Sequence, residues 1–159
     1  MKHLLLVILI LASSRVQAFQ SIYLVRHAEK QDSSRDPALS INGKKRAMDL
    51  AWHLRDANIQ AIFTSEFQRT QRTAAPLAEL LNLKPQVIDG KDLSKLITTL
   101  KADKSSATAL VVGHSNTVPE LLKGLGVTLL VELAEDEFDK LIVIALPKQG
   151  EPIVNVLRY

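Results

Sequence analysis

The amino-acid sequence predicts an α/β fold: a three-layer α/β/α sandwich around a mostly parallel mixed sheet. Short apolar runs typical of buried strands alternate along the chain with longer stretches whose apolar residues recur at the helical period. The last two apolar runs, residues 140–146 and 153–159, are separated by a segment containing proline and glycine, which predicts a hairpin of antiparallel strands. With 159 residues, the chain has room for one domain with a substantial core.

The first strand and the first helix have clear signals. Five residues of largely apolar character in the stretch 21–30 predict a short buried strand, with Arg26 and His27 where it should end. The polar segment 31–37 predicts a loop. Ser40 is a suitable N-cap for a helix that we expect to reach about residue 58. One stripe of this helix is apolar and predicts its buried face: Ala47, Leu50, Ala51 and Leu54.

The alternation continues through the rest of the chain. Residues 61–64 predict a strand that leads into a helix with Arg69 in its first turn. Pro76 is expected to kink or interrupt that helix, because proline has no N–H group to donate. Four further elements are expected: an extended piece at 85–88, a helix at 92–100, a strand at 108–113 and a helix at 116–123.

The N-terminal residues 1–18 have the composition of a secretory signal peptide. A basic start is followed by an apolar run from Leu4 to Ala12. Val16-Gln17-Ala18 then resembles the small-residue pattern at which signal peptides are cleaved. We therefore expect a domain of residues 19–159 in the periplasm or outside the cell. The alternative is that residues 1–18 are retained as an N-terminal membrane anchor.

Charge and cysteine content exclude several classes of function. Without Lys2 and Arg15, the formal net charge falls from +3 to +1, which gives no argument for binding nucleic acid or a membrane surface. Contact with a membrane is expected only through an uncleaved N-terminus. The chain has no cysteine, so disulfides, thiolate chemistry and zinc–thiolate sites are excluded.

Residues that can bind an anion or act as a nucleophile stand at the ends of three predicted strands. Arg26 and His27 end the first strand, Arg69 follows the second, and His114 with Ser115 ends the strand at 108–113. In open α/β sheets, ligands bind beyond the carboxyl ends of the strands. Two arginines and two histidines at one sheet edge predict a binding site for an anion.

These residues resemble the signature of the histidine phosphatase superfamily, the phosphoglycerate-mutase-like proteins. Arg26-His27 is similar to the family's signature pair, with Ala28 where glycine is usual, and Val112-Gly113-His114-Ser115 is similar to its second-histidine segment. Two further segments match: Asp36-Pro37-Ala38-Leu39-Ser40 with Gly43, and Ser65 with Arg69 and Thr73-Ala74. The resemblance covers nearly all of the chain after residue 20, and it implies a phosphoglycerate-mutase-like fold and a phosphatase similar to the short phosphohistidine phosphatases.

The chemistry of the four central residues agrees with that resemblance. Arg26 and Arg69 offer planar sets of donors suited to phosphate oxygens. A neutral His27 can act as the nucleophile and form a phosphohistidine, provided that its other ring nitrogen is held by a backbone carbonyl. His114 is expected to stabilise the developing charge. Ser115 can contribute its N–H group to the pocket, or it can be a helix cap only.

The identity of the proton donor stays open. The candidates are Asp89 and Asp92, which follow the extended piece at 85–88, and Glu29, which alternatively orients the loop after His27. Arg72 is either a third phosphate contact or a solvent-facing helix residue. No metal and no cofactor are expected, since two guanidinium groups would repel a cation.

The sequence thus predicts an exported phosphatase that hydrolyses a phosphomonoester or a phosphoramidate through a phosphohistidine on His27. The expected partner is a small phosphorylated substrate or a phosphorylated envelope component. A mutase is disfavoured, because the short chain lacks insertions that would hold and reorient a bisphosphate. The alternative is a phosphate-binding module of the same fold without turnover.

Overall fold

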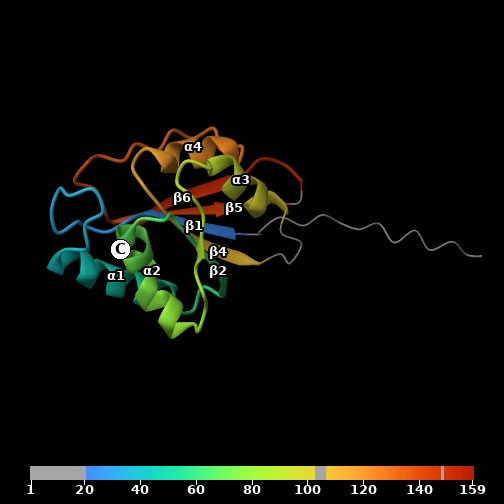
Figure 1. The fold of residues 1–159 in the computed structure, drawn as a ribbon. Coiled ribbons are helices and arrows are strands. Elements are labelled where there is room, and N and C mark those ends of the chain that lie inside the picture. Colours follow the sequence, from blue (N-terminus) through green and yellow to red (C-terminus); the bar gives the residue numbers. More distant parts are fainter. Residues whose placement is uncertain (1–20, 103–106, 148) are drawn as a thin grey trace, which may run out of the picture.

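The computed structural model describes residues 21–102, 107–147 and 149–159, and these form a sheet enclosed by helices on both faces (Figure 1). Strands and helices alternate as far as α4, and two strands follow. The elements are β1 (Ser21–Arg26), α1 (Ile41–Leu54), β2 (Ile59–Thr64), α2 (Gln68–Leu80), β3 (Gln86–Val87), α3 (Leu93–Ala102), β4 (Thr108–Gly113), α4 (Thr117–Gly124), β5 (Lys140–Ala145) and β6 (Ile153–Arg158). The predicted three-layer α/β/α sandwich is confirmed.

The described strands form one mixed sheet in the order β3-β2-β4-β1-β5-β6. β3, β2, β4 and β1 are parallel to one another, whereas β5 is antiparallel to β1 and β6 is antiparallel to β5. The mostly parallel sheet and its terminal hairpin are therefore as predicted. β4 lies between β1 and β2, so the ends of three strands that are distant in sequence become neighbours.

The two faces of the sheet have separate apolar cores, because successive side chains of a strand point to opposite faces. Ile22 and Leu24 of β1 pack with residues of α4 such as Leu121, whereas Val25 packs with Leu50 of α1 and Leu77 of α2. Figure 1 shows the same division, with α3 and α4 over one face and α1 and α2 over the other. Burial on both faces explains why β1 and β4 are apolar almost throughout.

α1 begins as predicted and ends earlier than predicted. The hydroxyl oxygen of Ser40 accepts a hydrogen bond from the N–H of Gly43 at 3.0 Å, which is the expected N-cap. The helix ends at Leu54 rather than near residue 58, because Asn58 has a φ of 53°, outside the helical region. β2 accordingly starts at Ile59, two residues before the predicted strand.

Pro76 was expected to kink or interrupt the second helix, and it does not interrupt it, since α2 runs continuously from Gln68 to Leu80. Proline removes the hydrogen bond to the carbonyl of the residue four positions earlier. That residue, Arg72, is exposed, so water can reach this part of the helix. Buried side chains on the opposite face, among them Ala74 and Leu77, hold the helix against the sheet.

Along the part of the chain that the structure describes, no helix is both long and apolar enough to span a bilayer. The predicted signal peptide, residues 1–18, lies outside the described residues, so its cleavage stays a prediction.

Candidate active site

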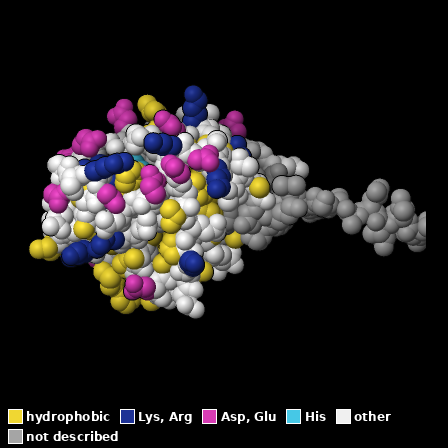
Figure 2. All heavy atoms as spheres, viewed as in Figure 1, with side chains coloured by type: hydrophobic (Ala, Val, Ile, Leu, Met, Phe, Trp, Pro, Cys, Tyr) yellow, Lys and Arg dark blue, Asp and Glu magenta, His cyan; other side chains and the backbone are white. Residues whose placement is uncertain are grey.

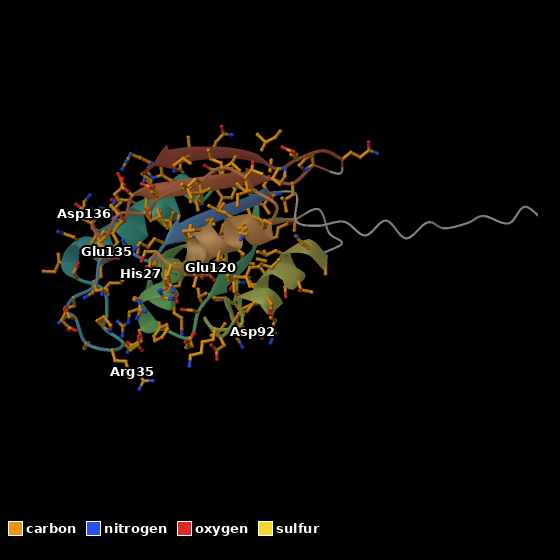
Figure 3. The ribbon with its side chains drawn as sticks, turned by 90° about the horizontal axis from the view of Figure 1, so that it is seen from above. His27, Arg35, Asp92, Glu120, Glu135 and Asp136 are labelled. Carbon is orange, nitrogen blue, oxygen red and sulfur yellow. The ribbon has the colours of Figure 1, made fainter. Side chains whose placement is uncertain are left out.

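Strand pairing brings the two predicted histidines together. β1 and β4 are parallel neighbours with Arg26 opposite Gly113, and the N–H of His27 donates to the carbonyl of Gly113 at 2.9 Å. His27 and His114 therefore leave the sheet side by side, and their ring centroids are 5.4 Å apart. Figure 3 shows His27 at the carboxyl end of β1.

The ring of His27 is held in the orientation that a nucleophile needs. Its Nδ1 atom lies 2.8 Å from the carbonyl oxygen of Ala28, which can only accept, so Nδ1 carries the proton and Nε2 keeps its lone pair. The N–H of Ala28 donates to the hydroxyl oxygen of Thr73 at 2.9 Å, which fastens this loop to α2. Burial lowers the pKa of His27 from 6.5 to about 4, so the ring is neutral near pH 7.

His114 is held by a residue whose contact with it the sequence analysis did not anticipate. Its Nε2 atom lies 2.9 Å from the hydroxyl of Ser65, which in turn lies 2.9 Å from the hydroxyl of Thr70. Burial, with a further contribution from the positive charge of Arg69, lowers the pKa of His114 to about 4. Ser65 follows the end of β2, the strand beside β4, so strand order was the missing information.

Arg69 is the arginine best placed to receive an anion. It is the second residue of α2, and its guanidinium carbon lies 4.2 Å from the centre of the Phe67 ring. Among the residues described, its guanidinium group has no hydrogen-bond partner and no ion-pair partner. Phe67 also packs edge-on against the ring of His114, with centroids 5.5 Å apart, so one aromatic side chain positions both groups.

Arg26 is only partly free for a ligand. Its Nη1 atom donates to the carbonyl oxygens of Ala134 at 2.8 Å and Glu135 at 3.0 Å, and its Nη2 atom lies 3.3 Å from the carboxylate of Glu135. Phe138 packs against the guanidinium group at 4.4 Å. The Nε atom is buried and has no partner in the described part of the chain. Arg26 thus anchors the segment before β5, and it also lines the cleft.

These side chains surround an open cleft of about 330 Å³ beyond the ends of β1, β2 and β4. Lys30 and Lys91 add positive charge at its wall. The lining residues are Arg26, His27, Lys30, Glu66, Phe67, Arg69, Gly90, Lys91, His114, Ser115, Asn116, Thr117 and Glu135. All five residues predicted to contact phosphate therefore meet in one cleft.

Ser115 and Asn116 do not cap α4 through their side chains. Asn116 is the N-cap residue but makes no side-chain cap hydrogen bond, and the hydroxyl oxygen of Thr117 accepts from the N–H of His114 at 3.0 Å instead. Arg72 binds the side-chain oxygen of Gln68 at 2.9 Å on the exposed surface of α2. It is a helix-surface residue and does not line the cleft.

The structure brings none of the three predicted proton donors into the cleft. The carboxylate of Glu29 accepts from Arg46 at 2.7 Å. Although burial opposes its ionisation, the hydrogen bonds from Arg46 keep the pKa of Glu29 below its ordinary value. The carboxylate of Asp89 accepts from the N–H of Lys91 at 2.9 Å, and Asp89 lines a separate apolar cavity behind His114.

Asp92 is turned to the beginning of α3. Its carboxylate accepts from the hydroxyl of Ser94 at 2.9 Å and from the N–H of Lys95 at 3.1 Å, so it caps the helix. Figure 3 shows it well away from His27. The carboxylates that do line the cleft are Glu66 and Glu135, which the sequence analysis missed.

No set of three or more histidine and acidic side chains that could hold a metal ion occurs in the described ranges, and the chain has no cysteine. Around the cleft, the donors are arginine, lysine, imidazole and backbone N–H groups, a set that fits an oxyanion better than a cation.

Comparison with known proteins agrees with this geometry. Residues 22–92 match the model of the histidine phosphatase superfamily (branch 1). The fold is similar to that of the protein histidine phosphatase SixA complexed with tungstate, with a TM-score of 0.70 and 20% identity over 87% of this chain and 96% of that one. It is also similar to that of mycobacterial glucosyl-3-phosphoglycerate phosphatase, with a TM-score of 0.66 and 14% identity over 87% of this chain and 98% of that one.

No curated protein matches the chain. At sequence identities of 20% and 14%, the solved structures show a similar fold only. The family match covers the segment that contains Arg26, His27 and Arg69. The second histidine, outside that match, lies beside the first at the end of the neighbouring strand. The chain is thus similar to the histidine phosphatase superfamily over residues 22–92, and its fold is similar to that of the protein histidine phosphatase SixA.

Proposed function

We propose that this protein is a metal-independent phosphatase that hydrolyses a phosphomonoester or a phosphoramidate through a phosphohistidine intermediate on His27. The match of residues 22–92 to the histidine phosphatase family and the similar fold support phosphatase activity, and therefore a hydrolase. The observation that carries the finer proposal is the state of His27: a neutral ring with Nδ1 held by a carbonyl, and Nε2 left free at the wall of a cationic cleft.

The substrate phosphate would be held by positive charge and N–H donors. Arg69 and the guanidinium group of Arg26 would contact its oxygens, and the backbone N–H of Ser115, which precedes α4 in the cleft wall, would add a donor. Two guanidinium groups replace the charge compensation that a metal ion would provide. Lys30 and Lys91 would attract the anion into the cleft.

The reaction would then proceed in two steps. The lone pair of Nε2 attacks phosphorus, the P–N bond forms, and the bond from phosphorus to the leaving group breaks. Water cleaves the P–N bond in the second step and restores neutral His27. His114, 5.4 Å away between ring centroids, would donate a hydrogen bond to the phosphoryl oxygens as charge develops. Because Nε2 of His114 faces Ser65, this donation requires Nδ1 or a turn of the ring.

The chemical class of the substrate rests on the similar structures. One is a protein histidine phosphatase, whose substrate is a phosphoramidate, and the other acts on a phosphoglycerate ester. We therefore propose either a small phosphorylated molecule or a phosphorylated envelope component as substrate. The envelope belongs to the proposal because residues 1–18 have the pattern of a signal peptide, which would deliver the enzyme to the periplasm or outside the cell.

The test is a comparison of the wild-type protein with His27→Ala, using ³²P-labelled phosphoprotein and p-nitrophenyl phosphate. The wild-type protein should release phosphate and carry an acid-labile label after rapid quenching, and His27→Ala should lose both. His53→Ala, a change at an exposed histidine on α1, should retain both. Phosphate binding without release by the wild-type protein would instead identify a binding module. Labelling that persists in His27→Ala would mean that another residue is the nucleophile.

A further inference from the structure

Glu66 lies between two residues that hold the second histidine. Ser65 contacts Nε2 of His114 through its hydroxyl, and Phe67 packs edge-on against the same ring. Glu66 is exposed and lines the cleft together with His27 and Arg69. A carboxylate at this position stands in the wall of the cleft, and its charge acts on the ring of His114.

The carboxylate of Glu66 is held at one oxygen and open at the other. Its Oε2 atom accepts a hydrogen bond from the N–H of Gly90 at 2.8 Å, across the cleft wall. Its Oε1 atom has no hydrogen-bond partner within the ranges described. A carboxyl group fixed in this way has one oxygen directed by the backbone and one available to a substrate.

The charge of Glu66 acts on the residues proposed to do the chemistry. Its negative charge opposes the lowering of the pKa of His114 that burial and Arg69 cause. With Asp36, it also opposes the lowering of the pKa of Arg69 that burial causes. The three acidic residues that the sequence suggested have no such relation to the cleft.

Glu135, the other carboxylate of the cleft, has a different role. It lies 3.3 Å from Nη2 of Arg26, and its side chain is 90% exposed. It stands on the segment between α4 and β5, and Figure 3 shows it at the same end of the molecule as His27. Because Glu135 neutralises an arginine that we assign to phosphate binding, it competes with the phosphate instead of facing the leaving group.

We propose that Glu66 is the general acid and base of the reaction, an inference that rests on the proposed function. As Nε2 of His27 bonds to phosphorus, the electron pair of the P–O bond passes to the leaving oxygen, and the carboxyl proton of Glu66 passes to that oxygen, so an alcohol departs. The resulting carboxylate then takes a proton from the water that attacks the phosphohistidine. The P–N bond breaks toward His27, inorganic phosphate forms, and Glu66 is protonated again.

The leaving group provides the test. An alkoxide departs poorly without a proton, and a positioned acid contributes about 10²–10⁴-fold to such a step, whereas p-nitrophenolate departs without one. We expect Glu66→Gln to lower kcat/KM for glycerol phosphate by about 10²–10⁴-fold and to change kcat/KM for p-nitrophenyl phosphate by less than about 5-fold. Retained aryl phosphatase activity also shows that the variant is folded.

Matched variants separate the possible outcomes. Asp89→Asn, next to Gly90 and outside the cleft, should hydrolyse both esters like the wild-type protein. Equal hydrolysis of glycerol phosphate by the wild-type protein and Glu66→Gln would overturn the inference and leave the proposed function intact, as would a selective loss in Glu135→Gln alone. A wild-type protein that hydrolyses neither ester and takes up no label would overturn the proposed function, and the inference with it.

Discussion

Two buried histidines should make the stability of this protein fall steeply between pH 7 and pH 5. Burial lowers the pKa of both His27 and His114 from 6.5 to about 4. Below pH 6.5 the two imidazoles bind protons in the unfolded chain, whereas in the folded protein they stay neutral until the pH approaches 4. Acid therefore favours the unfolded state. The stability present above pH 6.5 is thus lost as the pH falls toward 4.

The size of this effect follows from the difference of about 2.5 pH units. Integrated from pH 7 to pH 5, the linkage amounts to about 2 kcal/mol of unfolding free energy per histidine, or about 4 kcal/mol for both. Glu29 and Glu137, whose pKa values lie below 4.5, contribute only at lower pH, because their unfolded forms stay ionised above pH 5. The window from pH 7 to pH 5 therefore reports mainly on the histidines.

Urea unfolding at pH 7 and pH 5 measures the effect. The wild-type protein should lose about 4 kcal/mol, and the double variant His27→Gln/His114→Gln should lose about 4 kcal/mol less over the same interval. His53→Gln, a change at an exposed histidine, is the control and should keep the wild-type pH dependence. An equal slope in the wild-type protein and the double variant would refute the assignment of the two imidazoles as neutral groups in a desolvated site.

Two further predictions concern the loop after His27 and the N-terminus. A Cβ atom on Gly43 would overlap the carbonyl oxygen of Glu29, so Gly43→Ala should destabilise the protein by about 1–3 kcal/mol in urea unfolding; unchanged stability would mean that the helix can move away from this loop. N-terminal sequencing of the exported protein should begin near Phe19, and recovery of intact residues 1–18 in a membrane fraction would favour the anchor.

Local patterns in the sequence were sufficient for the elements and for the central residues of the site. The strand at 108–113 was predicted with its observed bounds, because its short apolar run contains β-branched residues and ends at a glycine. The convergence of His27 and His114 followed from their places at the ends of parallel strands, and the N-cap at Ser40 followed from residue type. Each of these depends on residues close together in the chain or on a general property of parallel sheets.

Helix limits were less predictable. Whether α2 continues through Pro76 depends on the free energy of packing its buried face against the sheet, which exceeds the cost of one missing hydrogen bond. The end of α1 depends on a turn at Asn58 that the apolar stripe does not specify. Tertiary packing therefore corrected both expectations.

The partners of the residues that line the cleft depended wholly on contacts between distant parts of the chain. Arg26 meets carbonyl oxygens more than a hundred residues later, and Ser65 reaches His114 because β4 lies between β1 and β2. Glu66 faces the cleft through a hydrogen bond to Gly90, whereas the acidic residues nearer the expected positions turn to Arg46, to a backbone N–H or to the cap of α3. The sequence determined which residue types were present at the strand ends. Only the tertiary structure decided which carboxylates line the cleft, because a side chain's direction is set by neighbours that have no fixed separation along the chain.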